Sequence, residues 1–212
     1  MLMRITVKGL AQFMTAGPAR QRSVVRDFKY PDPEGKARAL YYAEAVRAVR
    51  RFHRAANDVG VLVDEVARLA RESAAATGVT SRRLRDNAAG LRQYATHFAA
   101  RNYEVLQPVR WALQHGPVVV AVTPDLHVVD EGRERIIKLE FATTRPDRRV
   151  VQVITQAMFE AAEMAGAGLQ AADVLYVDVR RGEVHGGARI RARLARDIEA
   201  ACATIADIWN SI

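Results

Sequence analysis

Residues 117–141 constrain the fold more than any other stretch of this sequence. They read PVVVAVTPDLHVVDEGRERIIKLEF, which is three apolar runs separated by a polar break at 123–125 and a turn signal at 131–132. Such runs predict short strands joined as a β-hairpin or meander. If residues 131 and 132 form a two-residue turn, Asp125 on the second strand lies opposite Lys138 on the third.

Strand alternation places both charged side chains of the third strand's apolar stretch on one face. Lys138 and Glu140 share one face with Ile136, while residues 137, 139 and 141 are apolar and point the other way. Lysine and glutamate are depleted from strand centres, so their presence here needs an explanation. Asp125, Lys138 and Glu140 could together hold a metal ion and orient a water molecule. Alternatively, Asp125 caps its strand and Lys138 is a cross-strand ion-pair partner.

The composition is that of a soluble globular protein. Of the 212 residues, 50% are hydrophobic and 26% are charged, which suffices for one domain with a sizeable core. No run approaches the roughly 18 apolar residues of a membrane span, and the N-terminus lacks the apolar segment of a signal peptide. We therefore expect a cytoplasmic protein without a membrane partner. The single cysteine, Cys202, excludes an intramolecular disulfide, a four-cysteine zinc site and a cysteine-ligated iron–sulfur cluster.

The charge of the chain invites a polyanionic partner. The formal net charge is +8 and the pI is near 10.1, which is typical of proteins that bind nucleic acid. Nearly all of the basic residues are arginine, however, and a GC-rich genome favours arginine and alanine whatever the function. Charge alone therefore leaves both explanations open.

The hydrophobic periodicity predicts a single α/β domain over residues 1–212. A mostly helical N-terminal lobe covers 1–112, and a core of strands and helices covers 113–212. In the lobe we expect helices at 36–57, at 58–75 and from Thr80 or Ser81 onward, and a short helical turn at Trp111 and Leu113. In the core, after the three strands, we expect an amphipathic helix at 148–164, strands at 174–179 and 183–185, and a last helix at 188–209.

The order of these elements, with certain residues in them, resembles the PD-(D/E)XK nuclease superfamily, specifically its RecB-like exonuclease branch. The residues that carry the resemblance are Pro124-Asp125 on the second strand, Lys138-Leu139-Glu140 on the third, the glutamine-bearing helix VVQVITQAMFEAA, the strand VLYVDV and the opening segment ITVKGLAQFMTAGPARQR. The resemblance implies a PD-(D/E)XK-like core, in which a mixed sheet is flanked by helices. Each motif is short, and only their order and spacing together are specific.

The resemblance also implies a metal-dependent chemistry. In the family, an aspartate and a later acid bind one or two Mg²⁺ (or Mn²⁺) ions, and a lysine helps to activate the attacking water. Asp125 matches the aspartate, but the family's acid-x-Lys is reversed here as Lys138-Leu139-Glu140. If Lys138 is the family lysine, the acid position is Ile136 and a ligand is lost. If Glu140 is the acid, the charges still share one face and a metal ion could be held.

Residues outside the strands are implied with less precision. The family places a glutamine on the helix after the third strand, and either Gln152 or Gln156 could fill that place or be solvated on the outer face beside Phe159. Arg148 and Arg149 start this helix, where the dipole disfavours cations, so a phosphate contact is one explanation for them. Candidates for a further acid or histidine in the helical lobe are Glu44, His53, Glu65 and Glu72.

Three functions follow as hypotheses. The first is a magnesium-dependent phosphodiesterase acting on DNA, with Asp125 and Glu140 as metal ligands, Lys138 acting on the water and a glutamine supporting the site. The second is a catalytically inactive nuclease-fold protein that binds nucleic acid or serves as a partner subunit. The third is a helical interaction protein whose sheet is only structural. The sequence leaves open whether the nucleic acid is DNA or RNA and whether it is single- or double-stranded.

Overall fold

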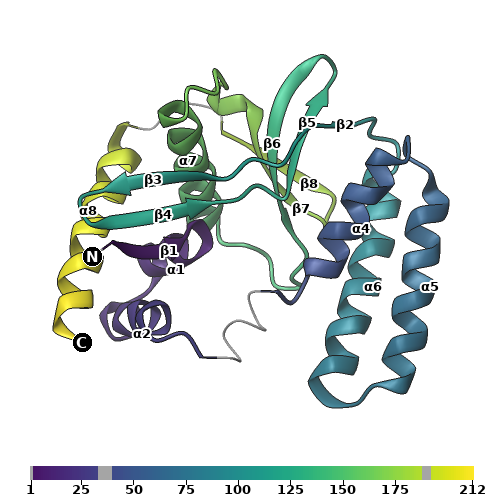
Figure 1. The fold of residues 1–212 in the computed structure, drawn as a ribbon, viewed down its shortest axis with the longest axis horizontal. Coiled ribbons are helices and arrows are strands. Elements are labelled where there is room, and N and C mark those ends of the chain that lie inside the picture. Colours follow the sequence, from purple (N-terminus) through teal and green to yellow (C-terminus); the bar gives the residue numbers. More distant parts are fainter. Residues whose placement is uncertain (1, 33–39, 188–191) are drawn as a thin grey trace.

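The chain forms an α/β fold with two mixed sheets (Figure 1). The structure is a computed structural model that describes residues 2–32, 40–187 and 192–212. The three-stranded sheet has the order β1-β4-β3, with β1 (Met3–Thr6) parallel and β3 (Trp111–His115) antiparallel to the central β4 (Val118–Val122). The five-stranded sheet consists, in spatial order, of β2 (Glu104–Val105), β5 (Leu126–Asp130), β6 (Arg133–Glu140), β7 (Val174–Asp178) and β8 (Glu183–Gly186).

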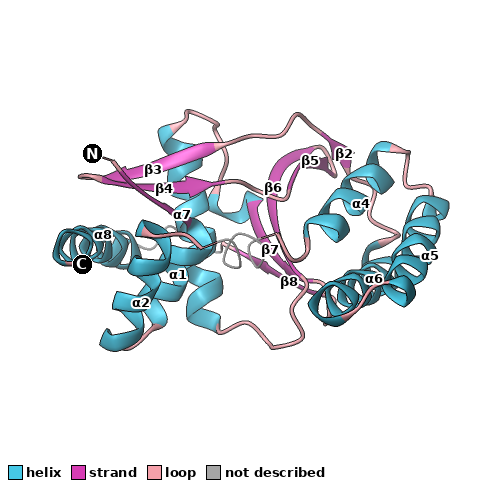
Figure 2. Cartoon of the chain, turned by 60° about the horizontal axis from the view of Figure 1, so that its bottom comes forward, coloured by secondary structure: helices cyan, strands magenta, loops and turns pink. Residues whose placement is uncertain are grey.

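The helices form two groups, which lie on opposite sides of the five-stranded sheet (Figure 2). The first group is α1 (Val7–Thr15), α2 (Pro18–Lys29), α7 (Arg148–Met164) and α8 (Ala192–Ser211). The second is α4 (Ala43–Arg54), α5 (Val59–Ala75) and α6 (Gly78–Phe98). A 3₁₀ turn, η1 (Ala171–Asp173), precedes β7. None of the helices in the described ranges is both long enough and apolar enough to cross a membrane.

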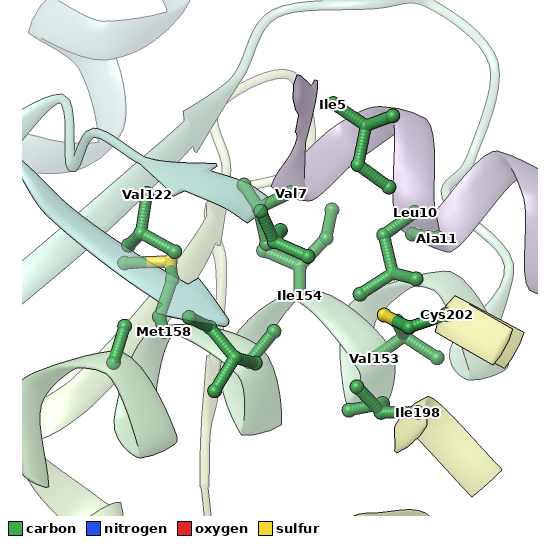
Figure 3. Packing of buried hydrophobic residues seen from close by; sticks show 14 of the residues in the cluster. Ile5, Val7, Leu10, Ala11, Val122, Val153, Ile154, Met158, Ile198 and Cys202 are labelled. Carbon is green, nitrogen blue, oxygen red and sulfur yellow. The ribbon is translucent and has the colours of Figure 1, made fainter. Parts of the chain in front are cut away.

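Two apolar clusters follow from the alternation of β6. Ile136 belongs to the cluster between the two sheets, α1, α7 and α8, whereas Ile137 and Leu139 belong to the cluster under α4, α5 and α6. The faces predicted for this strand are therefore confirmed. Figure 3 shows the first cluster, in which Cys202 packs against the surrounding apolar side chains with no exposed surface. Burial, aided by nearby glutamates, raises the pKa of its thiol to about 11, which suits a packing role.

The hairpin between β5 and β6 has the expected register. Leu126 pairs with Ile137 and Asp130 with Arg133, which leaves a two-residue turn at Glu131 and Gly132. Both turn residues have positive φ, 53° and 77°, as the tight turns that join twisted strands require. A backbone hydrogen bond of 2.8 Å from the N–H of Asp125 to the carbonyl of Ile137 extends the ladder, so Asp125 faces Lys138 as predicted.

Of the two alternatives for residues 117–141, the hairpin forms and the meander does not, because the first apolar run is β4, which pairs with β1 and β3 in the other sheet. The prediction for the segment before β4 was wrong. Trp111 and Leu113 lie in β3 rather than in a helical turn. The reason is that β3 and β4 form a hairpin of their own around Gly116, whose φ is 57°. The pairing of β4 with β1 joins Met3 to Val118, which are too far apart in the sequence to leave a local signal.

The helix predictions differ from the structure at several ends. The helix expected at 36–57 is α4, from Ala43 to Arg54, and residues 36–39 lie outside the described ranges. The third helix starts at Gly78 with Thr77 as its N-cap, one turn earlier than expected. α8 is described from Ala192, and residues 188–191 again lie outside the description. α5 and α7 match their predicted bounds.

Candidate functional site

Asp125 and Lys138 form a close ion pair across the β5–β6 hairpin. The Lys138 Nζ lies 3.1 Å from Oδ1 and 3.0 Å from Oδ2 of Asp125, and the Leu139 N–H donates to Oδ2 at 2.9 Å. The two side chains are only 14% and 22% exposed. The facing that the sequence predicted is therefore a direct contact, and both oxygens of the carboxylate have protein donors.

Glu140 is buried two positions further along the same face. Its Oε2 accepts hydrogen bonds from Lys8 Nζ at 2.9 Å and from the Tyr176 hydroxyl at 3.1 Å, and its Oε1 accepts from the Ala142 N–H at 3.1 Å. Burial by itself raises the pKa of Glu140, but the charge of Lys8 and these hydrogen bonds outweigh it, so the pKa lies below its ordinary value. Glu140 is therefore ionised at neutral pH, with Lys8 as its counter-ion.

A third acid, Asp178, lies beside Glu140 because β6 and β7 pair Glu140 with Asp178 in register. It has no exposed surface. Its Oδ2 lies 2.8 Å from Arg181, and its Oδ1 accepts the backbone N–H groups of Arg180 and Arg181. We call Asp125, Glu140 and Asp178 the acid face. Each of these acids has its own cation, Lys138, Lys8 or Arg181.

The acid face does not fit a divalent cation as it stands. Every carboxylate oxygen of Asp125, Glu140 and Asp178 accepts at least one hydrogen bond from a protein donor. A metal ion would have to compete with the ammonium and guanidinium groups that already supply positive charge to each acid. No group of three or more histidine, cysteine, aspartate or glutamate side chains within the described residues is arranged to hold a metal ion. Ile136, the acid position of the family pattern, is fully buried in the apolar cluster.

The two glutamines of α7 lie in different surroundings. Gln156 is 6% exposed, and its Nε2 donates to Glu160 Oε1 at 2.8 Å, so the prediction of a solvated outer face is wrong for it. Phe159, expected on the same outer face, is also buried. α7 is covered on both sides because it lies between the sheets and the neighbouring helices α1 and α8. Gln152 is half-buried and lines a cavity beside α7.

The candidates in the helical lobe form networks of their own. Glu44, Glu65 and Glu72 all bind Arg68, at 2.9, 2.7 and 2.6 Å, and Glu44 also binds Arg83. His53 is buried between Asn57 and the Tyr94 hydroxyl, each 2.6 Å from a ring nitrogen. Burial lowers its pKa, although the hydrogen bond to Asn57 opposes this. None of these four side chains has a hydrogen bond or ion pair with the acid face.

Sequence reasoning missed the residues that complete the acid face. Lys8 comes from the first turn of α1 and lies 132 positions before Glu140 in the chain. Arg50 of α4 donates from Nε to the backbone carbonyl of Asp125 at 2.6 Å, which fixes the start of β5 against the helical lobe. No spacing in the sequence links these pairs. Asp178 could have been found, because it follows the buried run VLYV at the end of a strand that was predicted.

Comparison of the chain with models of protein families, with curated proteins and with solved structures finds no match.

Proposed function

We propose that this protein binds nucleic acid through a nuclease-like fold and does not cleave it. The order of elements supports a PD-(D/E)XK-like core. The β5–β6 hairpin is followed by the crossover helix α7 and by β7, which lies parallel to β6. Asp125, directly before β5, faces the Lys138-Leu139-Glu140 segment of β6, which supports the resemblance.

The single observation that carries the proposal is the pairing of every acid on the acid face with its own cation. In this superfamily, hydrolysis depends on carboxylates that are free to bind metal ions. Here Lys138, Lys8 and Arg181 lie 3.0, 2.9 and 2.8 Å from the carboxylates of Asp125, Glu140 and Asp178. These cations neutralise the acids and hold them within the fold.

Affinity for nucleic acid is supported by the surface charge. The chain carries a formal net charge of +8, and several exposed arginines of the helices have no acidic partner among the residues that the structure describes. These arginines are Arg22 and Arg26 on α2, Arg47 and Arg54 on α4, and Arg85 and Arg92 on α6. Unpaired guanidinium groups are available for phosphate oxygens, and such contacts give an affinity that falls as salt rises.

The test combines binding and digestion with one set of labelled DNA and RNA oligonucleotides. We expect binding at low salt that weakens as salt is raised, and intact oligonucleotides after incubation with Mg²⁺ or Mn²⁺. Metal-dependent cleavage that Asp125→Ala abolishes would contradict the proposal and establish a phosphodiesterase. Absence of binding to every oligonucleotide at low salt would also contradict it and favour a helical interaction protein.

A further inference from the structure

A cavity of about 790 Å³ lies between the first half of α7 and the strand β8. We call it the α7–β8 groove. Its lining includes Arg145 before α7, Arg148, Gln152 and Phe159 of α7, and His185 of β8 with Gly187 directly after that strand. It is partly open to solvent, and polar side chains of α7 face into its lining, where a ligand could meet them.

Two polar groups in the α7–β8 groove have no partner among the residues that the structure describes. Arg148 is exposed, and its guanidinium has neither a hydrogen bond nor an ion pair within the described ranges. The side-chain amide of Gln152, one helical turn further on, likewise makes no hydrogen bond to the described residues. The neighbouring cations differ, because Arg149 binds Asp197 at 2.7 Å and Arg145 binds Glu183 at 2.8 Å.

The position of Arg148 favours an anionic ligand. It occupies the first turn of α7, where the helix dipole disfavours a cation. The N-cap residue Asp147 accepts a hydrogen bond from the Arg149 N–H through Oδ1 at 2.6 Å. A guanidinium at a helix start, with no partner among the described residues, suits a phosphate, whose negative charge the helix dipole also favours at this end.

The rest of the lining suits a flat organic body. Val151, Phe159 and Ala171 give the groove an apolar wall, and the Gln152 amide can both donate and accept in one plane, as the edge of a nucleobase requires. His185 lies with its ring centroid 6.4 Å from that of Tyr176, whose hydroxyl donates to Glu140. The groove therefore adjoins the acid face.

The volume limits the ligand to a single strand. Cavities of roughly 300–1,000 Å³ bind molecules of drug or nucleotide size, and a duplex is too wide to enter one. We propose that the α7–β8 groove binds one nucleotide unit, with the phosphate on Arg148 and the base edge at Gln152. This inference builds on the proposed function, since it makes the nucleic acid single-stranded. A free nucleotide has the same chemistry.

The experiment compares a labelled single-stranded oligonucleotide with its duplex, using fluorescence polarisation at low salt. The variants are Arg148→Ala, Gln152→Ala and the matched control Arg149→Ala, which removes the same charge one position away and outside the groove. We expect Arg148→Ala to weaken single-strand binding roughly tenfold and Gln152→Ala by a smaller factor. Arg149→Ala should change single-strand affinity less than about twofold, because it removes an exposed, screened charge. Affinity for the duplex should likewise change less than about twofold in these variants.

Three outcomes would overturn the inference. They are equal losses for Arg148→Ala and Arg149→Ala, equal losses for single strand and duplex, and failure of adenosine monophosphate to compete with the single strand. The first two leave the proposed function in place, because binding itself persists. If the wild-type chain binds no oligonucleotide, the proposed function fails. Titration with adenosine monophosphate alone then tests the groove, and binding that Arg148→Ala abolishes supports it as a site for a free nucleotide.

Discussion

The acid face and the α7–β8 groove lie next to each other but differ in how their polar groups are used. On the acid face, Asp125, Glu140 and Asp178 are each paired with a cation at 3.0 Å or less. In the groove, Arg148 and Gln152 have no partner among the described residues. Both regions depend on the crossover from β6 through α7 to β7, which brings the two sets of side chains together.

This difference separates charges that hold the fold together from charges that are available to a ligand. The acid face carries the residues that resemble a nuclease motif, yet each of its carboxylate oxygens already accepts a hydrogen bond from the protein. The groove carries no strong motif, yet its Arg148 and Gln152 side chains have no partner among the described residues. The motif therefore locates the acids that could bind a metal ion, and the contacts show which side chains are available to a ligand.

The largest effect on stability is expected from restoring an acid at the position that the family pattern requires. Ile136 has no exposed surface and packs within the cluster of α1, α7 and α8. We expect Ile136→Asp to destabilise the fold by roughly 4 kcal/mol or more, because it buries a carboxylate among apolar groups. Ile136→Val, the control, should cost about 1 kcal/mol. Urea denaturation followed by circular dichroism measures both, and a stable Ile136→Asp protein would contradict the packing.

Double-mutant cycles measure whether the enclosed pair Asp125–Lys138 is coupled more strongly than an exposed ion pair. Lys138→Met should cost about 2–3 kcal/mol, because the enclosed carboxylate of Asp125 loses its counter-ion and keeps one backbone donor. The matched pair Arg149–Asp197 is 44% and 38% exposed, so its coupling should be below about 1 kcal/mol. Similar coupling energies for the two pairs would show that the ion pair on the acid face contributes no more to stability than an exposed ion pair.

The pH dependence of stability tests the state of Glu140. Its pKa is lower in the folded chain than its ordinary value of 4.5, so its contribution is present above that value and lost as the pH falls through the folded pKa. Glu140→Gln should therefore destabilise the protein by about 1–2 kcal/mol at pH 7 and by progressively less below pH 4.5. A difference that stays constant between pH 7 and pH 3 would show that the charge of Glu140 contributes nothing.

The smallest expected effect is that of divalent cations on stability. Because the carboxylates are already paired with cations, Mg²⁺ or Mn²⁺ at millimolar concentration should shift the Tm by less than about 1 °C. Removal of these ions with EDTA should likewise leave the Tm unchanged. Differential scanning fluorimetry with and without EDTA measures this. A stabilisation by Mn²⁺ that disappears in Asp125→Ala but persists in Asp64→Ala, an acid of the helical lobe, would show that the acid face binds metal after all.

The parts of this protein that sequence reasoning predicted correctly are those with a local cause. The register of the β5–β6 hairpin follows from a two-residue turn in which Gly132 tolerates a positive φ. The two faces of β6 follow from the period of two, which places Ile136 and Ile137 in different clusters. The bounds of α5 and α7 follow from apolar periodicity and from the caps Asp58 and Asp147.

Only the tertiary structure decided which groups from distant segments meet. The sequence placed an acid, a lysine and a second acid on one face, and this was sufficient to suggest a metal site. It could not show that Lys8, 132 residues away, is the counter-ion of Glu140, or that parallel pairing places Asp178 beside it. Contacts between distant segments depend on how sheets and helices pack, which no local pattern encodes. For this reason the sequence determined where the charged face lies, and the fold determined that its charges are paired.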